Sequence, residues 1–152
     1  MIHLIKTLFE TLNTYANLLL CVVTAFYAHL LFKSFRVQKL SELNIELSRI
    51  FKMVIDHPYL DNPEYCRTYD NTKITDENIR YHAYCCCVFN LLNSTWKLFK
   101  GNKEKIDSFN GGVEFIKQHK TWWETLKDDE GTIFGYEKEF IKYVDSYLTK
   151  KP

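Results

Sequence analysis

Residues 15–32 read YANLLLCVVTAFYAHLLF and contain no charged side chain. As an α-helix, this stretch would rise about 27 Å, which is close to the thickness of the hydrocarbon core of a bilayer. The stretch therefore predicts an N-terminal transmembrane helix, with residues 1–36 as the anchor and residues 37–152 as a helical domain. A cleaved signal peptide is the alternative, but here the apolar run is long and the basic cluster follows it.

The charges on either side of the predicted span indicate its orientation. Lys33, Arg36 and Lys39 follow it closely, whereas only Lys6 and the terminal amine precede it. The positive-inside rule then places the C-terminal domain in the cytoplasm, in a single-pass topology. The cysteine usage agrees with a reducing compartment, because five cysteines, three of them adjacent at 85–87, do not resemble a disulfide framework.

The overall composition predicts one folded domain after the anchor. Aromatic residues make up 16% of the chain against only 5 Gly and 3 Pro, which supplies a packed core and lacks the signature of disorder. Lys and Arg number 20 against 19 Asp and Glu, for a formal net charge of +1. This balance gives no reason to expect a nucleic-acid partner.

A narrow polar stripe runs along the predicted span. At 100° per residue, its members fall within about 80° of one another: Lys6, Glu10, Asn13, Asn17, Cys21, Thr24 and Ala28. Because unpartnered polar groups are costly in hydrocarbon, the stripe predicts contact with another helix in a homo-oligomer, with a pore lining as one form of that contact. The alternative is that only Asn17 and Thr24 are immersed, and that the residues before them lie among lipid headgroups.

The helical period continues beyond the span. Apolar residues recur every three or four positions from Val37 to Val54, so the anchor either runs unbroken into a helix that stops before His57-Pro58 or gives way to a separate helix capped by Ser41. Residues 57–75 predict a structured loop with one short turn around Pro63.

Three further helices are predicted, which makes the fold all-α, with the transmembrane helix followed by a small antiparallel bundle. The first covers residues 76–99, with acidic residues at its start, Gly101 at its end and a buried stripe of Tyr81, Cys85, Val88, Leu92, Trp96 and Phe99. The second is marked by Phe115, Ile116, His119, Trp122, Trp123 and Leu126, and the third follows Gly135. Trp122 and Trp123 point in different directions on a helix, so one of them is a candidate for contact with a membrane surface or a partner; packing of both inside the domain is the safer assumption.

The chemical signals in the domain are sparse. His82 and Cys86 lie four residues apart, a spacing that lets two side chains reach one metal, and Cys66 or His57 would have to supply further ligands. The chain has neither a CxxC pair nor an HExxH motif, so we interpret the cysteines as small buried hydrophobes. We therefore expect no catalytic, cofactor-binding or metal-binding residue.

The order of these features resembles a diffuse group of uncharacterised bacterial single-span, membrane-anchored small helical proteins. The resemblance rests on the N-terminal span, the stretch DHPYL at 56–60, an aromatic loop through Tyr65, the long central helix, and Trp122 followed by Tyr136 and Phe140. It implies a bacterial inner-membrane protein with a cytoplasmic helical domain. Some small proteins of similar build act as membrane effectors in defence against phage, and the resemblance implies no particular functional residue.

Together these observations predict a non-enzymatic module that is held in the lipid bilayer, self-associates through its span and senses a protein or small molecule. A co-encoded protein is the expected partner. Two alternatives stay open: a membrane-tethered, metal-dependent enzyme that uses His82 and Cys86, and a structural subunit of a larger membrane complex.

Overall fold

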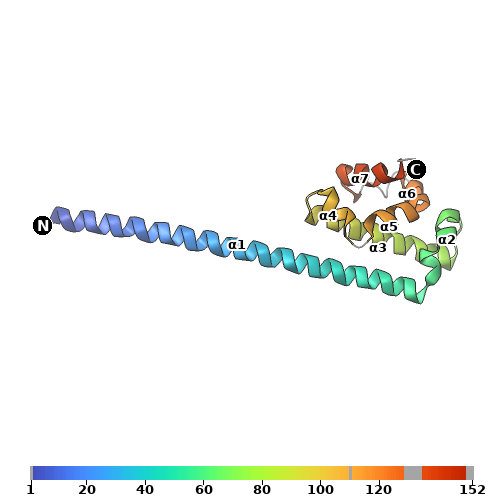
Figure 1. The fold of residues 1–152 in the computed structure, drawn as a ribbon, viewed down its shortest axis with the longest axis horizontal. Helices are drawn as coiled ribbons and strands as arrows, with labels where there is room; N and C mark the ends of the chain where they lie inside the picture. The colour runs from blue at the N-terminus through green and yellow to red at the C-terminus, as the bar shows by residue number, and fades with distance from the viewer. Residues whose placement is uncertain (1, 110, 129–134, 150–152) are drawn as a thin grey trace. The chain divides into compact units, whose positions relative to one another are not determined.

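The computed structural model describes residues 2–109, 111–128 and 135–149, and for residues 2, 4, 5 and 8–10 it describes the backbone alone. These residues form seven α-helices and one short 3₁₀ helix, with no strand among them, so the predicted all-α fold is confirmed (Figure 1). The chain divides into two compact units, Met1–Leu40 and Ser41–Pro152, and each is described by itself.

Helix α1 covers Ile2–Asp56 without a break, so Ser41 caps no separate helix. It ends immediately before His57 and Pro58, as the sequence predicted, and the His57 N–H still donates to the Met53 carbonyl at 2.9 Å. Proline supplies no N–H and disfavours helical geometry in the residue before it, which explains why the helix stops there. A 3₁₀ helix, η1, then covers Pro58–Asp61.

The predicted loop after η1 contains a complete short helix, α2, over Pro63–Thr68. The Asn62 side chain caps it by accepting hydrogen bonds from the N–H groups of Glu64 at 2.9 Å and Tyr65 at 3.3 Å. Proline at the first helical position needs no N–H partner, so the Asn-Pro pair begins the helix efficiently. The Asn62-Pro63 pair is visible in the sequence, but the predicted short turn around Pro63 is too brief, because the structure has a helix of six residues there.

Helix α3, Asp76–Leu98, matches the predicted central helix closely. Thr75 caps its start, and its hydroxyl accepts from the Asn78 N–H at 3.2 Å. At its end Lys100 and Gly101 adopt positive φ angles, and the Gly101 N–H donates to the Trp96 carbonyl at 3.0 Å. This arrangement satisfies a carbonyl that the helix would otherwise leave without a partner.

The predicted single helix after residue 111 is instead two helices, α5 over Gly112–Gln118 and α6 over Lys120–Asp128, preceded by α4 at Lys103–Asp107. The chain turns at His119, whose φ of −99° and ψ of 26° are not helical. Gly112 allows α5 to approach α3 closely, because a Cβ at this position would lie 3.0 Å from a methyl group of Leu92.

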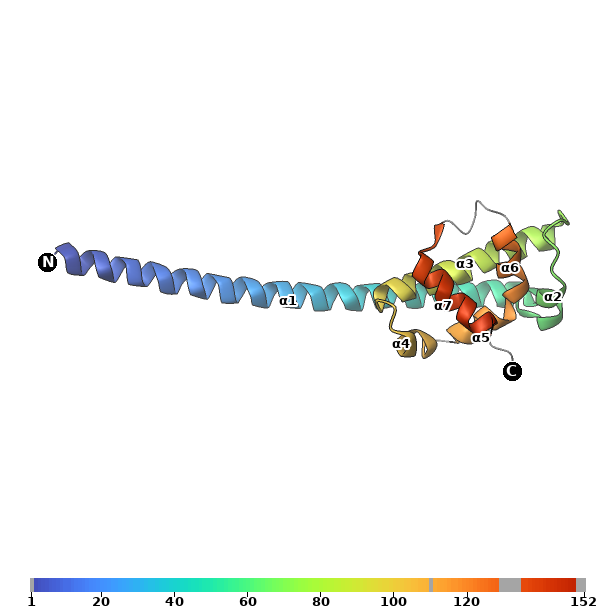
Figure 2. The same ribbon diagram turned by 90° about the horizontal axis from the view of Figure 1, so that it is seen from above.

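Within the second unit, α3 lies between the end of α1 and the layer formed by α5, α6 and α7, Lys138–Leu148 (Figures 1 and 2). Leu43, Leu47 and Ile50 of α1 are buried in the same core. Aromatic residues supply the largest fully buried side chains of the interior, among them Tyr81, Tyr84, Phe89, Trp122, Trp123, Phe140 and Tyr143.

Trp122 and Trp123 are packed inside the domain as assumed, whereas Trp96 departs from expectation. Trp122 and Trp123 are both fully buried, and Phe89 stacks against both, with ring centroids 5.1 and 4.7 Å apart. Since α6 is covered on two sides, neither indole reaches the surface. Trp96, predicted to be buried, is only partly so, although its ring centroid lies 4.8 Å from that of Tyr143.

Candidate functional site

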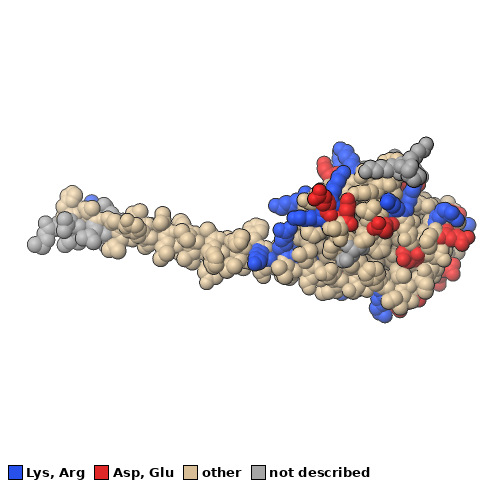
Figure 3. Space-filling view, in the orientation of Figure 1, with Lys and Arg blue, Asp and Glu red and all other residues tan. Residues whose placement is uncertain are grey.

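The N-terminal part of α1 is apolar and uncovered. Every side chain from residue 11 to residue 39 is exposed, including Leu19 at 65%, Tyr27 at 63% and Leu31 at 69%. Among the described residues this is the one helix long and apolar enough to cross a membrane. Figure 3 shows it as a nearly uncharged rod on the face drawn. A helix whose exposed surface is mostly apolar is suited to hydrocarbon.

The predicted polar stripe lies on this part of α1. Asn13, Asn17 and Cys21 are exposed, and neither amide has a hydrogen-bond partner within the described part of the chain. Thr24 differs, because its hydroxyl donates to the Leu20 carbonyl of its own helix at 2.8 Å. The side chain of Glu10 lies outside the described residues. Of the two amides, Asn17 lies inside the uncharged run 15–32 and Asn13 precedes it, so an unpartnered amide is more costly in hydrocarbon at Asn17.

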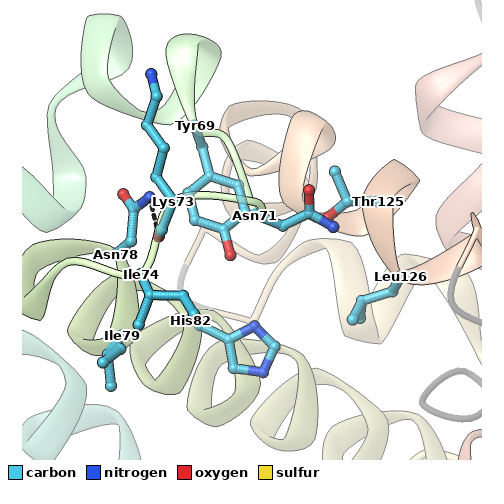
Figure 4. Close-up of a pocket in the computed structure, with 9 residues that line it drawn as sticks. All are labelled: Tyr69, Asn71, Lys73, Ile74, Asn78, Ile79, His82, Thr125 and Leu126. Atoms are coloured by element: carbon cyan, nitrogen blue, oxygen red, sulfur yellow. Dashed lines mark hydrogen bonds between the residues drawn. The ribbon is translucent and has the colours of Figure 1, made fainter.

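A surface cleft of about 290 Å³ opens in the second unit where the loop before α3 meets α6 (Figure 4). The lining residues are Tyr69, Asn71, Lys73, Ile74, Asn78, Ile79, His82, Thr125 and Leu126. The lining mixes amide, hydroxyl and imidazole groups with apolar walls and includes no carboxylate. Its volume lies at the lower end of the range for small-molecule sites.

Asn78 organises the loop that forms one wall of this cleft. Its amide donates to the carbonyls of Asp70 at 2.8 Å and Lys73 at 2.9 Å, and its oxygen accepts from the Tyr65 hydroxyl at 2.7 Å (Figure 4 shows the Lys73 bond). The Asp70 carboxylate also accepts from the N–H and the hydroxyl of Thr72. These bonds lower the pKa of Asp70 and hold the loop in one conformation.

The residues of the metal-site alternative do not converge. His82 accepts a hydrogen bond at its Nδ1 from the indole N–H of Trp122 at 3.2 Å, and Cys86 is half-buried. His57 instead contacts Arg80 at 3.0 Å, and the Cys66 thiol donates to the Leu60 carbonyl at 3.6 Å. Across residues 2–109, 111–128 and 135–149, no three His, Cys, Asp or Glu side chains are grouped so that they could hold a metal ion.

A buried polar cluster that the sequence did not reveal lies where α2, α3 and the end of α5 meet. The Tyr81 hydroxyl is 2.9 Å from Nδ1 of His119, and it also interacts with the thiols of Cys66 and Cys85. All four side chains are fully buried. Next to them, the Gln118 amide donates to both the backbone and the side-chain oxygen of Asp61, each at 2.7 Å.

Burial keeps this cluster uncharged. It lowers the pKa of His119 to about 4, raises that of Tyr81, and raises that of the Cys85 thiol well above its ordinary value. Among the residues that the structure describes, the Nε2 atom of His119 and the hydroxyl of Tyr84 find no hydrogen-bond partner, and the centroids of the two rings are 5.4 Å apart. A protonated thiol sealed from solvent is not a nucleophile, so the cluster acts within the core and not as a reactive centre.

The three adjacent cysteines of α3 meet three environments. Cys85 is fully buried, Cys86 is half-buried and Cys87 is exposed. Burial raises the pKa of all three thiols, and the carboxylate of Glu46 adds to this effect at Cys87. The run therefore presents its thiols in different directions around the helix, as the sequence predicted.

Comparison with known proteins gives no relative from which a function could be transferred. The resemblance stated from the sequence therefore stays an expectation. No protein-family model matches the chain, and neither a curated protein nor a solved structure matches it.

Proposed function

We propose that this chain is a single-span membrane protein whose N-terminal helix anchors a non-enzymatic helical domain, and that copies associate through the polar stripe of the span. One observation carries the proposal: over residues 11–32, α1 exposes an uncharged surface made mainly of apolar side chains. Leaving that surface in water is unfavourable by about 25 cal/mol for each Å², whereas hydrocarbon removes the cost.

The orientation in this proposal follows from the flanking charges. Lys33, Arg36 and Lys39 stay on the cytoplasmic side, so the domain, which we take to be an antiparallel bundle, lies in the cytoplasm of a bacterial cell at its inner membrane. A reporter enzyme that works only in the cytoplasm, fused after Pro152, should be active. A fusion active only when exported would refute this orientation.

Self-association is proposed because the stripe presents amides that the helix itself does not satisfy. Asn13 and Asn17 have no partner within the described residues, and a second copy of the span would supply one. Thr24 contributes less, since its hydroxyl proton is already bonded to the Leu20 carbonyl. The proposal thus places most of the hydrogen bonding between copies on Asn17.

The domain is proposed to bind, not to catalyse. Its buried polar cluster is sealed, and its open cleft combines Tyr69, Asn71 and His82 without a carboxylate or a metal-ligand set. We propose that a protein or small molecule engages the domain and that the assembled span then perturbs the membrane, as bacterial defence effectors of similar build do. A co-encoded protein is the partner we would test first.

Flotation tests the anchoring directly. The full chain should rise with liposomes of pure phosphatidylcholine in a density gradient and stay bound after washing at pH 11, because a spanning helix is held by apolar burial and not by charge. A shortened chain that lacks residues 1–40 and keeps residues 41–152 should not float. Release of the full chain at pH 11 would overturn the anchor.

A further inference from the structure

The first unit ends in a segment where cations and aromatic rings alternate. Phe32 and Phe35 are 79% and 59% exposed, and the cations Lys33 and Arg36 beside them are also exposed. The ammonium of Lys39 lies 5.7 Å from the centre of the Phe35 ring. We call residues 32–39 the basic collar; it directly follows the apolar run, at the end of the uncharged rod in Figure 3.

The helix places these cations on one side and within two helical turns. At 100° per residue, Lys33, Arg36 and Lys39 fall within about 120° of one another, over a rise of about 9 Å. The headgroup layer on each side of a bilayer is about 5 to 8 Å thick. If Phe32 marks the edge of the hydrocarbon, Lys33 and Arg36 therefore both lie within the headgroup layer.

The sequence around Lys33 and Arg36 offers these two cations no acidic neighbour. Residues 11–41 contain no Asp or Glu. Within the described part of the chain, Lys33 and Arg36 have no ion-pair partner. Two cations farther along the same helix do have ion-pair partners. Arg49 pairs with Glu46, one turn before it, and Lys52 pairs with Asp56, one turn after it, at 3.2 Å.

We propose that the basic collar binds the headgroups of anionic phospholipids, so that the protein selects them over zwitterionic lipids. The inference rests on the proposed anchoring and adds a lipid preference to it. The Arg36 guanidinium can donate two parallel N–H bonds to one phosphate, and Lys33, three residues away, supplies a compact second charge. Zwitterionic headgroups offer the same phosphate but bring their own cation, which opposes these two.

The test measures which lipid the purified full chain retains. The protein is held in mild non-ionic detergent with equal amounts of phosphatidylglycerol and phosphatidylcholine, and the bound lipids are counted by native mass spectrometry. Wild type should retain phosphatidylglycerol in excess. A cation near an anionic surface changes affinity about fivefold, so Lys33→Gln with Arg36→Gln should reduce the enrichment by about fivefold for each cation removed.

A matched variant controls for net charge. Arg49→Gln with Lys52→Gln removes two cations from the same helix outside the collar, and it should keep the wild-type enrichment. Equal retention of the two lipids by wild type, or an unchanged enrichment in the collar variant, would overturn the proposal.

Flotation on pure phosphatidylcholine separates this result from failure of the anchoring. A wild-type chain that floats but shows no enrichment refutes the collar and leaves the anchor standing. A chain that does not float on any liposome refutes the anchor, and the collar with it.

Discussion

The buried imidazole of His119 predicts that acid destabilises the folded domain. In the folded protein this ring is fully buried and neutral, with Tyr81 as its hydrogen-bond partner at one nitrogen and, within the described part of the chain, none at the other. Burial lowers its pKa to about 4, whereas the unfolded chain should show the ordinary value of 6.5. The unfolded state therefore binds a proton at a higher pH than the folded state does.

The magnitude follows from the difference between these two pKa values, about 2.5 pH units. At 1.36 kcal/mol per unit, this corresponds to about 3 kcal/mol of unfolding free energy. The sign is fixed by the lowered folded pKa: the contribution is fully present above pH 6.5, falls between pH 6.5 and 4, and is gone below pH 4. Such a loss is a large share of the roughly 5 to 15 kcal/mol that stabilises a typical domain.

The assay is urea unfolding of the full chain in mild detergent, followed by tryptophan fluorescence at several pH values from 8 to 4. His119→Asn keeps a hydrogen-bonding group near Tyr81 but cannot titrate. Between pH 8 and pH 4 the unfolding free energy of wild type should therefore drop by about 3 kcal/mol more than that of His119→Asn. His82→Asn, which removes an exposed imidazole, should leave the wild-type pH dependence in place. If His119→Asn loses as much stability in acid as wild type, the reasoning about His119 is refuted.

Three other substitutions test the core, the stripe and the thiols. Trp123→Ala should lower the free energy of unfolding in urea by about 3 to 5 kcal/mol, because the Trp123 ring is fully buried. Trp96→Ala should lower it clearly less, because Trp96 is only partly buried, and equal losses would contradict this burial pattern. Asn17→Leu should insert normally but lower the oligomeric mass in mild detergent, whereas Tyr15→Phe on the opposite face should not; an unchanged mass would make the stripe a bystander. Cys86→Ser should leave unfolding free energy within about 1 kcal/mol and metal content unchanged, and loss of bound zinc on this substitution would reverse our interpretation.

The elements that the sequence predicted well are those marked by local signals. The end of α1 at Asp56 was predicted from Pro58, and the extent of α3 from its acidic first turn and Gly101, all of which act within a few residues. The break at His119 was missed because the three- and four-residue spacing of apolar positions continues across it. No Gly or Pro marks that turn, so only the packing of α5 and α6 reveals it.

Within the buried polar cluster, too, local periodicity predicted some features and missed others. Burial of Tyr81 and Cys85 was predictable from the period of α3, since each lies on its apolar stripe. The pairing of Tyr81 with His119, 38 residues later, depends on how two helices meet, which periodicity does not encode. Burial of both Trp122 and Trp123 has the same origin, because it requires a helix to be covered from two sides.

The cysteine run on α3 gives this domain a graded sensitivity to oxidants and electrophiles. Reaction should begin at Cys87, which solvent reaches, and proceed to Cys86 only as the helix surface opens locally. Cys85 is protected for as long as the core holds. A modified Cys85 would therefore record that the domain had unfolded, and modification of Cys87 alone would record only exposure to the reagent.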